Sequence, residues 1–401
     1  MKKIVLAYSG GLDTSIAIKW LEDKYAAEVI TVTVDVGQQE NLKKIAEKAE
    51  KIGVTKHYSI DAKQEFVKDY IYPSIMANGL YQGKYPLISA LTRPLIAKKL
   101  VDVAHWEGAT AIAHGCTGKG NDQVRIDVTS KAIDPNLKII APIREWNLSR
   151  EEEIQYAKDK NIPIEPKKSI YSLDQNLWGR SIESGPLEQP DVEPSDDAFE
   201  WVNPIEKTPD KPGYLKIEFE HGIPISVDEE PIDDPVSAIN LVNKKAGGHG
   251  VGIIDHIEDR LVGIKSREVY ESPAGICFIE SHKDLEKMVL TRHQLFFKEI
   301  VDNQWAWLVY SGLWVDPLLL NLQAFIKSTQ TLVNGQVTLK MFKGGIRVVG
   351  RSSNTSLYDP KLATYTSSST FNQKAAEGFI ELWGLPSRAS YSVGKKIGGG
   401  T

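Results

Sequence analysis

Short apolar runs alternate with helical patterns along the first third of the chain, and this alternation constrains the fold more than any other feature. Apolar runs predict strands over 4–8, 29–34 and 110–113, and apolar residues at helical spacing predict helices over 16–21, 42–52 and 95–106. Strands that alternate with helices of this length form βαβ units. The chain is therefore predicted to begin with an α/β domain, a parallel sheet with helices on both faces.

The pattern changes in the second half of the chain. Six of the 20 prolines lie between Pro186 and Pro212 among acidic residues, so this stretch is predicted to be an extended connector without long regular elements. Further along, alternation predicts a strand over 215–219 and a hairpin over 337–349. Aromatic and aliphatic residues at helical spacing predict helical structure over 284–322. A short helix over 373–383 is expected before a polar tail, 394–401, that frays or docks on a neighbouring subunit.

Composition narrows the possible partners and the compartment. Lys and Arg total 48 against 53 Asp and Glu, which gives a net charge of −5. Because a mildly acidic protein is poorly suited to bind a polyphosphate backbone, long RNA or DNA is not the favoured partner. The two cysteines form no CxxC pattern, which excludes a disulfide framework and a zinc ribbon. No apolar run reaches the roughly 18 residues of a membrane helix, and the first run is too short for a signal peptide. We expect a soluble cytoplasmic protein that binds neither membrane nor nucleic acid.

A glycine-rich loop, Ser9–Ser15, stands between the first predicted strand and the first predicted helix. Phosphate oxygens need several converging N–H donors, and a helix N-terminus supplies unpaired N–H groups and a favourable dipole. Gly10 and Gly11 let the backbone approach an anion that a side chain would block. The loop also follows a strand, at the sheet edge where open α/β sheets bind ligands. It is therefore predicted to hold phosphate.

A second polar loop, His114–Arg125, again follows a predicted strand, so both loops are expected at the same edge of the sheet. Asn121 and Asp122 can accept hydrogen bonds from an ammonium group, and Thr117 can donate to a carboxylate. Arg125 can clamp a second carboxylate with its planar fork. These groups suit an amino acid placed beside the phosphate site.

Each loop also has a simpler interpretation. In the first, Asp13 or Thr14 would only cap the helix and the glycine pair would only form a tight turn. The second would be a solvated surface loop. The pairing of the two loops favours a ligand site. A Walker A motif is absent, and the glycine-rich stretch 248–252 precedes a strand instead of following one, so it is predicted to be a loop.

The first loop is similar to the SGGxD[ST] signature of the PP-loop, or N-type, ATP pyrophosphatases, which cleave ATP to AMP and pyrophosphate. Together with HGCTGKGNDQVR, it makes the chain resemble the argininosuccinate synthase family. Further matching stretches are Tyr85, 92–94, 140–142, 171–177, 265–275, 350–351 and 356–358. The resemblance covers nearly the whole chain.

The resemblance implies a set of site residues. ATP contacts are implied for Ala7, Tyr8, Ser9, Gly10, Gly11, Leu12, Asp13, Thr14, Ser15, Val34 and Gly115. Aspartate contacts are implied for Thr117, Asn121 and Asp122. Citrulline contacts are implied for Tyr85, Ser89, Asn121, Arg125, Ser172, Ser181, Glu258 and Tyr270. No residue is firmly assigned as catalytic: Asp13 is a candidate for positioning Mg-ATP and Asp122 for proton transfer. No dedicated metal site is expected.

Two positions depart from the family pattern. Ala90 stands where a hydroxyl residue that contacts citrulline is common, and Ser89 is the candidate to replace it. Cys116 replaces a small residue, usually alanine, in the second loop, and is expected to be a neutral spacer rather than a nucleophile.

The resemblance implies a carbon–nitrogen ligase of arginine biosynthesis. It would join citrulline to aspartate through a citrullyl-AMP intermediate, using ATP with Mg²⁺ as substrate and no prosthetic group. Three domains are implied: 1–168 binds nucleotide, 169–360 is an α+β synthetase and multimerisation domain, and 361–401 is a C-terminal helical arm in a homotetramer. The alternatives are another PP-loop adenylating enzyme, such as a tRNA-modifying enzyme, and a non-catalytic nucleotide sensor.

Overall fold

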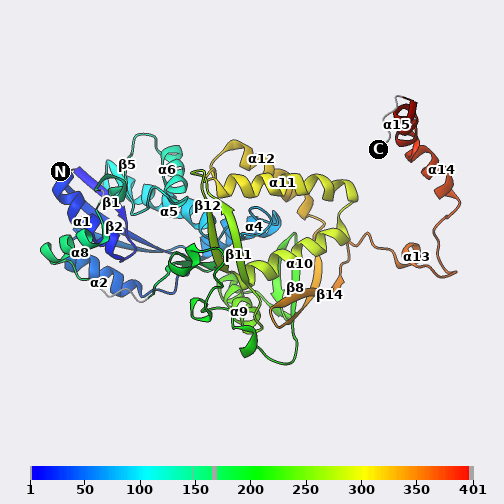
Figure 1. Cartoon of the computed structure of the whole chain (residues 1–401), viewed down its shortest axis with the longest axis horizontal. Coiled ribbons are helices and arrows are strands. Elements are labelled where there is room, and N and C mark those ends of the chain that lie inside the picture. Colours follow the sequence, from blue (N-terminus) through cyan, green and yellow to red (C-terminus); the bar gives the residue numbers. More distant parts are fainter. Residues whose placement is uncertain (1, 147, 165–168, 397–401) are drawn as a thin grey trace. The chain divides into compact units, whose positions relative to one another are not determined.

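The structure is a computed structural model that describes residues 2–146, 148–164 and 169–396 (Figure 1). These residues divide into two compact units between Thr355 and Ser356. The domain boundaries at 168 and 360 stay a prediction. In the part of the chain that is described, no helix is both long enough and apolar enough to cross a membrane.

A five-stranded parallel sheet forms the N-terminal part of the first unit, as predicted. Its strands are β1 (Lys2–Ala7), β2 (Ala27–Asp35), β3 (Lys56–Asp61), β4 (Ala111–Ala113) and β5 (Lys138–Ile140), in the order β3-β2-β1-β4-β5. Strand β1 pairs with β2 on one side and with β4 on the other. The strand order reverses at this point, so the loops after β1 and β4 lie next to each other.

Helices cover both faces of this sheet. The helices of this part of the chain are α1 (Leu12–Tyr25), α2 (Leu42–Ile52), α3 (Lys63–Phe66) with a π-helical turn at Val67–Ile71, α4 (Tyr72–Met76), α5 (Ile88–Glu107), α6 (Asp122–Ile133), α7 (Pro142–Trp146) and α8 (Arg150–Asp159). Among them, α4 packs against α10 and α12 and not against the parallel sheet. Alternate residues of β1 enter different cores. Ile4 and Leu6 pack with apolar residues of α1 and α2, whereas Val5 packs with those of α5.

The predicted helix over 95–106 is too short. Helix α5 begins at Ile88 and contains Pro94. A proline inside a helix removes one backbone donor and normally disrupts the turn before it. Leu91 and Leu95 are fully buried on either side of Pro94, so packing outweighs this penalty.

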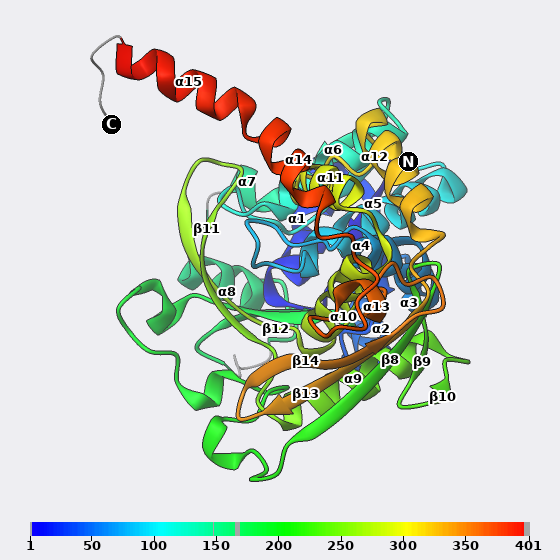
Figure 2. The ribbon, with the colours of Figure 1, turned by 90° about the vertical axis from the view of Figure 1, so that its right-hand side faces the viewer.

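Two antiparallel sheets follow. One has the order β10-β9-β8-β13-β14 and the other β11-β12-β7-β6. The strands are β6 (Ser172–Asn176), β7 (Gly179–Glu183), β8 (Gly213–Glu220), β9 (Ile223–Val227), β10 (Glu230–Pro231), β11 (Ile253–Asp259), β12 (Lys265–Glu271), β13 (Gly335–Phe342) and β14 (Gly345–Ser352). Figure 2 shows β13 and β14 beside β8. The predicted hairpin is confirmed, and its turn residues Lys343 and Gly344 both have positive φ, as a type I′ turn requires.

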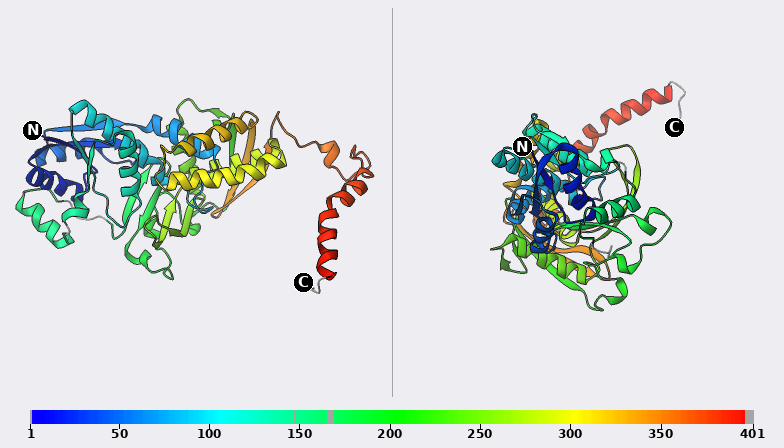
Figure 3. Two further views of the ribbon diagram at one scale, coloured as in Figure 1. Left: turned by 90° about the horizontal axis from the view of Figure 1, so that it is seen from above. Right: turned by 90° about the vertical axis from the view of Figure 1, so that its left-hand side faces the viewer.

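The remaining helices of the first unit are α9 (Pro235–Gly248), α10 (Pro273–Val289), α11 (Arg292–Tyr310) and α12 (Pro317–Gln330). Helices α11 and α12, coloured yellow to amber, lie against each other (Figures 1 and 3). The connector between 185 and 212 holds only short 3₁₀ turns among its described elements, as its prolines predict.

The second unit contains α13 (Pro360–Ala363), α14 (Ala375–Trp383) and α15 (Leu385–Lys396). The predicted helix at 373–383 is confirmed as α14. The predicted polar tail is wrong at its start, because 394–396 continue α15, and 397–401 lie outside the described residues. Pro386 stands in the first turn of α15, where proline is tolerated.

Candidate active site

The first glycine loop lies where the sequence predicts it, between β1 and α1. Gly10 has a φ of +76°, which favours glycine, and a methyl group there would meet Ile45 at 3.2 Å. Gly11 is the N-cap residue of α1 and has no side-chain cap. The interpretation of Asp13 or Thr14 as a helix cap is therefore wrong. The first turn of α1 instead offers backbone N–H groups that no capping side chain occupies, as an anion site requires.

Hydroxyl groups line this loop and support one another. The Ser9 Oγ lies 3.1 Å from the Thr14 Oγ1 and accepts a hydrogen bond from the Gly11 N–H. The Ser15 hydroxyl donates to the Gly11 carbonyl and lies 3.2 Å from the Tyr8 hydroxyl. These contacts fix the path of the chain around the two glycines.

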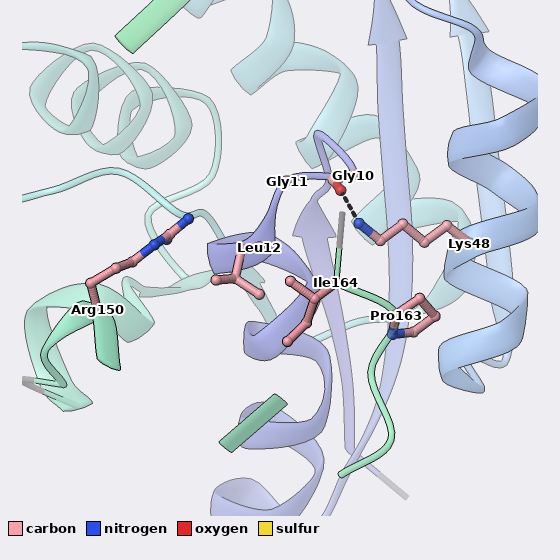
Figure 4. Close-up of a pocket in the computed structure, with 7 residues that line it drawn as sticks. All are labelled: Gly10, Gly11, Leu12, Lys48, Arg150, Pro163 and Ile164. Carbon is pink, nitrogen blue, oxygen red and sulfur yellow. Dashed lines mark hydrogen bonds between the residues drawn. The ribbon is translucent and has the colours of Figure 1, made fainter. Parts of the chain in front are cut away.

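Two cations approach the first loop from other helices, and sequence reasoning missed both. Lys48 of α2 donates to the Gly10 carbonyl at 2.6 Å, and Arg150 of α8 contacts the Asp13 carboxylate at 2.8 Å. Together with Leu12 and Ile164 they help to line a cavity of about 220 Å³ over the loop (Figure 4). Positive charge beside free N–H groups suits a polyphosphate.

The second glycine loop touches the first. A Cβ atom on Gly115 would stand only 2.8 Å from the Cγ2 of Thr14, so the chain passes here with no room for a side chain. Val34 is buried and stands one residue before the end of neighbouring β2, at the same edge of the sheet. The predicted neighbourhood of both loops is thereby confirmed. Thr117 is exposed in the second loop.

Four residues implied for citrulline come from the four-stranded sheet. The strand register pairs Tyr270 of β12 with Ser181 of β7. Glu258 of β11 accepts a hydrogen bond from the Tyr270 hydroxyl at 2.7 Å. Ser172 of β6 shares its face with Asp174, because side chains alternate along a strand. The sheet therefore brings these side chains, distant in sequence, to one face, here called the substrate face.

Charged groups connect the substrate face to the second loop. Arg93 of α5 contacts Asp122 at 2.8 Å and Asp174 at 2.6 Å. Arg125 contacts the other oxygen of Asp122 at 2.9 Å. Desolvation opposes ionisation of Asp122, yet these two guanidinium groups hold its pKa below the usual range. Asp122 is thus an ionised acceptor held between two arginines, an arrangement that favours positioning over proton transfer.

Aromatic residues enclose the end of Arg125. Its Nε donates to the Tyr310 carbonyl at 3.0 Å, and its Nη1 donates to the Ser89 hydroxyl at 3.1 Å. The Tyr85 ring stacks on the Tyr270 ring with centroids 4.4 Å apart. The Tyr310 hydroxyl donates to Glu258 and accepts from the Asn121 amide. Tyr310 belongs to a buried helical segment, and its sequence alone gives no sign of this contact.

The two departures from the family pattern have clear structural positions. Ala90 is fully buried in α5, whereas Ser89 contacts both Tyr85 and Arg125, so the hydroxyl at this turn is supplied by Ser89. Desolvation, with the nearby Asp122, raises the pKa of the Cys116 thiol to about 12. The thiol is therefore protonated at neutral pH and is a poor nucleophile.

The chain matches two family models, the arginosuccinate synthase N-terminal HUP domain over residues 3–163 and the arginosuccinate synthase C-terminal domain over 171–390. It is 56% identical over 391 residues to the argininosuccinate synthase of Pyrococcus furiosus, covering 98% of this chain and 95% of the relative. It is 54% identical over 400 residues to that of Listeria monocytogenes serotype 4a, covering 99% and 98%. It is 53% identical over 397 residues to that of Bacillus subtilis, covering 98% of each.

Proposed function

Because the chain belongs to the argininosuccinate synthase family, we infer that it joins citrulline to aspartate at the expense of ATP and releases AMP and pyrophosphate. Identity above 50% along nearly the whole chain carries this inference. It favours this reaction over the two alternatives, a tRNA-modifying enzyme and a nucleotide sensor. The reaction belongs to arginine biosynthesis.

ATP is proposed to bind at the first loop, with its phosphates on the N–H groups of Gly10 and of residues 12–14, the first turn of α1. Lys48 and Arg150 are added to the residues implied by the resemblance, because both line the cavity over the loop. The described residues include no group of three or more His, Cys, Asp or Glu side chains that could hold a metal. Mg²⁺ is therefore proposed to arrive with ATP, bound to phosphate oxygens and met by the exposed Asp13 carboxylate.

The amino acids are proposed to bind between the second loop and the substrate face. Aspartate is assigned to Thr117, Asn121 and Asp122. Citrulline is assigned to the Arg125 fork and to the set Tyr85, Ser89, Asn121, Ser172, Ser181, Glu258 and Tyr270. The contacts of Arg93 with both Asp122 and Asp174 support this placement, since they bring the second loop against the substrate face.

The proposed chemistry needs alignment and charge neutralisation more than covalent catalysis. The ureido oxygen of citrulline attacks the α-phosphorus of ATP, and the bond to the departing pyrophosphate breaks. In the resulting citrullyl-AMP, the former ureido carbon is a better electrophile. The aspartate amine attacks that carbon, the carbon–oxygen bond to AMP breaks, and the nitrogen loses its proton. No side chain is assigned as the proton acceptor.

Product analysis tests this function. The protein is incubated with Mg-ATP and citrulline, with and without aspartate, and AMP, ADP and argininosuccinate are separated by chromatography. We expect AMP and argininosuccinate in equal amounts when all three substrates are present. Formation of ADP in place of AMP would contradict the proposal, because it would mean cleavage at the γ-phosphate.

The chain is further proposed to act as a homotetramer in the cytoplasm. Helix α14 exposes an apolar set that a subunit contact would cover: Phe379, Ile380, Leu382 and Trp383. The two free cysteines suit a reducing compartment. Light scattering on the full chain should give the mass of four 44.6 kDa chains, and Leu382→Asp should lower it. A monomer in the unmodified protein would contradict the tetramer.

A further inference from the structure

The tip of the β11–β12 hairpin rests on the second glycine loop. The Leu261 N–H donates to the Asn121 side-chain oxygen at 2.9 Å, and the Arg260 Nη1 contacts the Lys119 carbonyl at 3.4 Å. The tip itself is closed by a hydrogen bond from the Arg260 N–H to the Ile264 carbonyl at 2.9 Å. The Leu261 N–H and the Arg260 guanidinium therefore join the hairpin to the loop that is proposed to hold aspartate.

Arg260 is anchored on the other side by the substrate face. Its Nε donates to the Ser266 hydroxyl at 2.7 Å, and its Nη2 contacts Glu183 at 2.9 Å and Glu268 at 2.5 Å. Glu268 is almost fully buried and also accepts from Ser266 at 2.6 Å. A guanidinium with this many fixed acceptors has little freedom to turn.

Strand register explains why the two carboxylates meet Arg260. Val269 of β12 pairs with Ile182 of β7, which places Glu268 beside Glu183 on the substrate face. His256 of β11 pairs with Glu268 on the same face. The two strands β11 and β12 lie side by side (Figure 1). This group is thus part of the wall that carries the residues assigned to citrulline, although the resemblance assigns it no role.

We propose that Arg260 is a positioning residue, a brace held by Glu183 and Glu268 that fixes the second glycine loop against the substrate face for the aspartate step. This inference rests on the proposed function. The guanidinium fork is required, because one side chain must reach the Lys119 carbonyl and the carboxylates at the same time. A lysine keeps the charge but supplies only a single donor centre.

The two half-reactions separate this role from a general loss of structure. Exchange of labelled pyrophosphate into ATP with citrulline alone reports formation of citrullyl-AMP, whereas argininosuccinate formation also needs aspartate. For Arg260→Lys we expect an aspartate KM raised about tenfold, with exchange within about twofold of the unmodified protein, because only the loop geometry shifts. For Glu268→Gln we expect a smaller rise in the aspartate KM, again with the exchange rate within about twofold of the unmodified protein.

Arg267→Lys is the matched control. Arg267 stands on the opposite face of β12 and contacts Asp255 and the carbonyls of Gln189 and Val192, so its substitution should leave the aspartate KM unchanged. An unchanged aspartate KM in both Arg260→Lys and Glu268→Gln would overturn the proposal, as would an exchange rate that falls as far as the overall rate. Absence of AMP and argininosuccinate when the unmodified protein is given all three substrates would instead refute the proposed function.

Discussion

Gly115 lies against Thr14 so closely that a methyl group on Gly115 would stand 2.8 Å from the Thr14 Cγ2. Real Cβ atoms are almost never found at that distance from another carbon, so one of the two loops would have to move. Thr14 is in the first turn of α1, whose N–H groups are proposed to hold the ATP phosphates. Gly115 is the second residue of the loop His114–Arg125, which is proposed to hold aspartate. The loop proposed to hold ATP and the loop proposed to hold aspartate are therefore in direct contact at Thr14 and Gly115.

Gly115→Ala should raise the ATP KM about tenfold, because separating the loops by even a fraction of an ångström misaligns the phosphate donors. Thr14→Ser removes the methyl group that the new side chain would meet and keeps the hydroxyl. The double variant Gly115→Ala with Thr14→Ser should recover most of the lost ATP affinity. Steady-state kinetics at saturating citrulline and aspartate measure both effects. A double variant as impaired as Gly115→Ala alone would argue against the steric explanation.

Arg125→Lys should raise the citrulline KM about a hundredfold while the ATP KM changes little. Lysine keeps the charge but cannot reproduce a fork that reaches Asp122, Ser89 and the Tyr310 carbonyl together. Initial rates with citrulline varied at saturating ATP give the value. A citrulline KM close to that of the unmodified protein would remove Arg125 from the citrulline site.

The activity should depend on pH through Glu183. Desolvation and the adjacent Glu268 carboxylate raise the pKa of Glu183 to about 7, against the attraction of Arg260. Above that pH the ionised carboxylate pairs with Arg260, and below it the protonated group loses most of that attraction. The aspartate kcat/KM of the unmodified protein, divided by that of Glu183→Gln, should therefore be largest near pH 8 and shrink toward pH 6. A ratio that stays constant would show that Glu183 does not act through its charge.

Lys298→Met should lower the free energy of unfolding by about 3–5 kcal/mol, because it leaves buried carboxylates without their cation. Lys298 is 1% exposed and contacts Glu286 at 3.0 Å and Asp302 at 2.8 Å. Lys265→Met is the matched control, since its ion pair with Asp259 is open to solvent and contributes little. Urea denaturation followed by fluorescence compares the two. If the two variants lower the urea midpoint of unfolding equally, the loss of stability in Lys298→Met does not come from the burial of its ion pairs.

Local signals made both glycine loops predictable from the sequence. An apolar run before each loop and helical spacing after the first predict a strand, a turn and a helix, and the parallel order then brings the loops to one edge. Strand β3 escaped prediction because its sequence, KHYSID, alternates weakly between apolar and polar residues. The helical arm predicted over 361–401 includes α15, but the bounds of this helix were not predicted, because Pro386 and several small polar residues weaken its helical pattern.

The substrate face could not be predicted from periodicity. Strands β6 and β7 read SLDQN and GRSIE, because the side chains that point toward the site are polar. Only the tertiary fold brings Lys48, Arg150 and Tyr310 to the loops, because nothing in the residue patterns of their helices α2, α8 and α11 indicates a ligand site. Arg93 lies in a stretch that matches the family, yet its contacts with Asp122 and Asp174 follow from packing between distant segments.

The account depends on attack by the ureido oxygen of citrulline on the α-phosphorus of ATP, and an isotope label tests that step directly. Citrulline labelled with ¹⁸O in the ureido group is incubated with the protein, Mg-ATP and aspartate, and AMP is analysed by mass spectrometry. The account predicts one ¹⁸O atom in each AMP formed and none in the pyrophosphate. Unlabelled AMP would contradict a citrullyl-AMP intermediate.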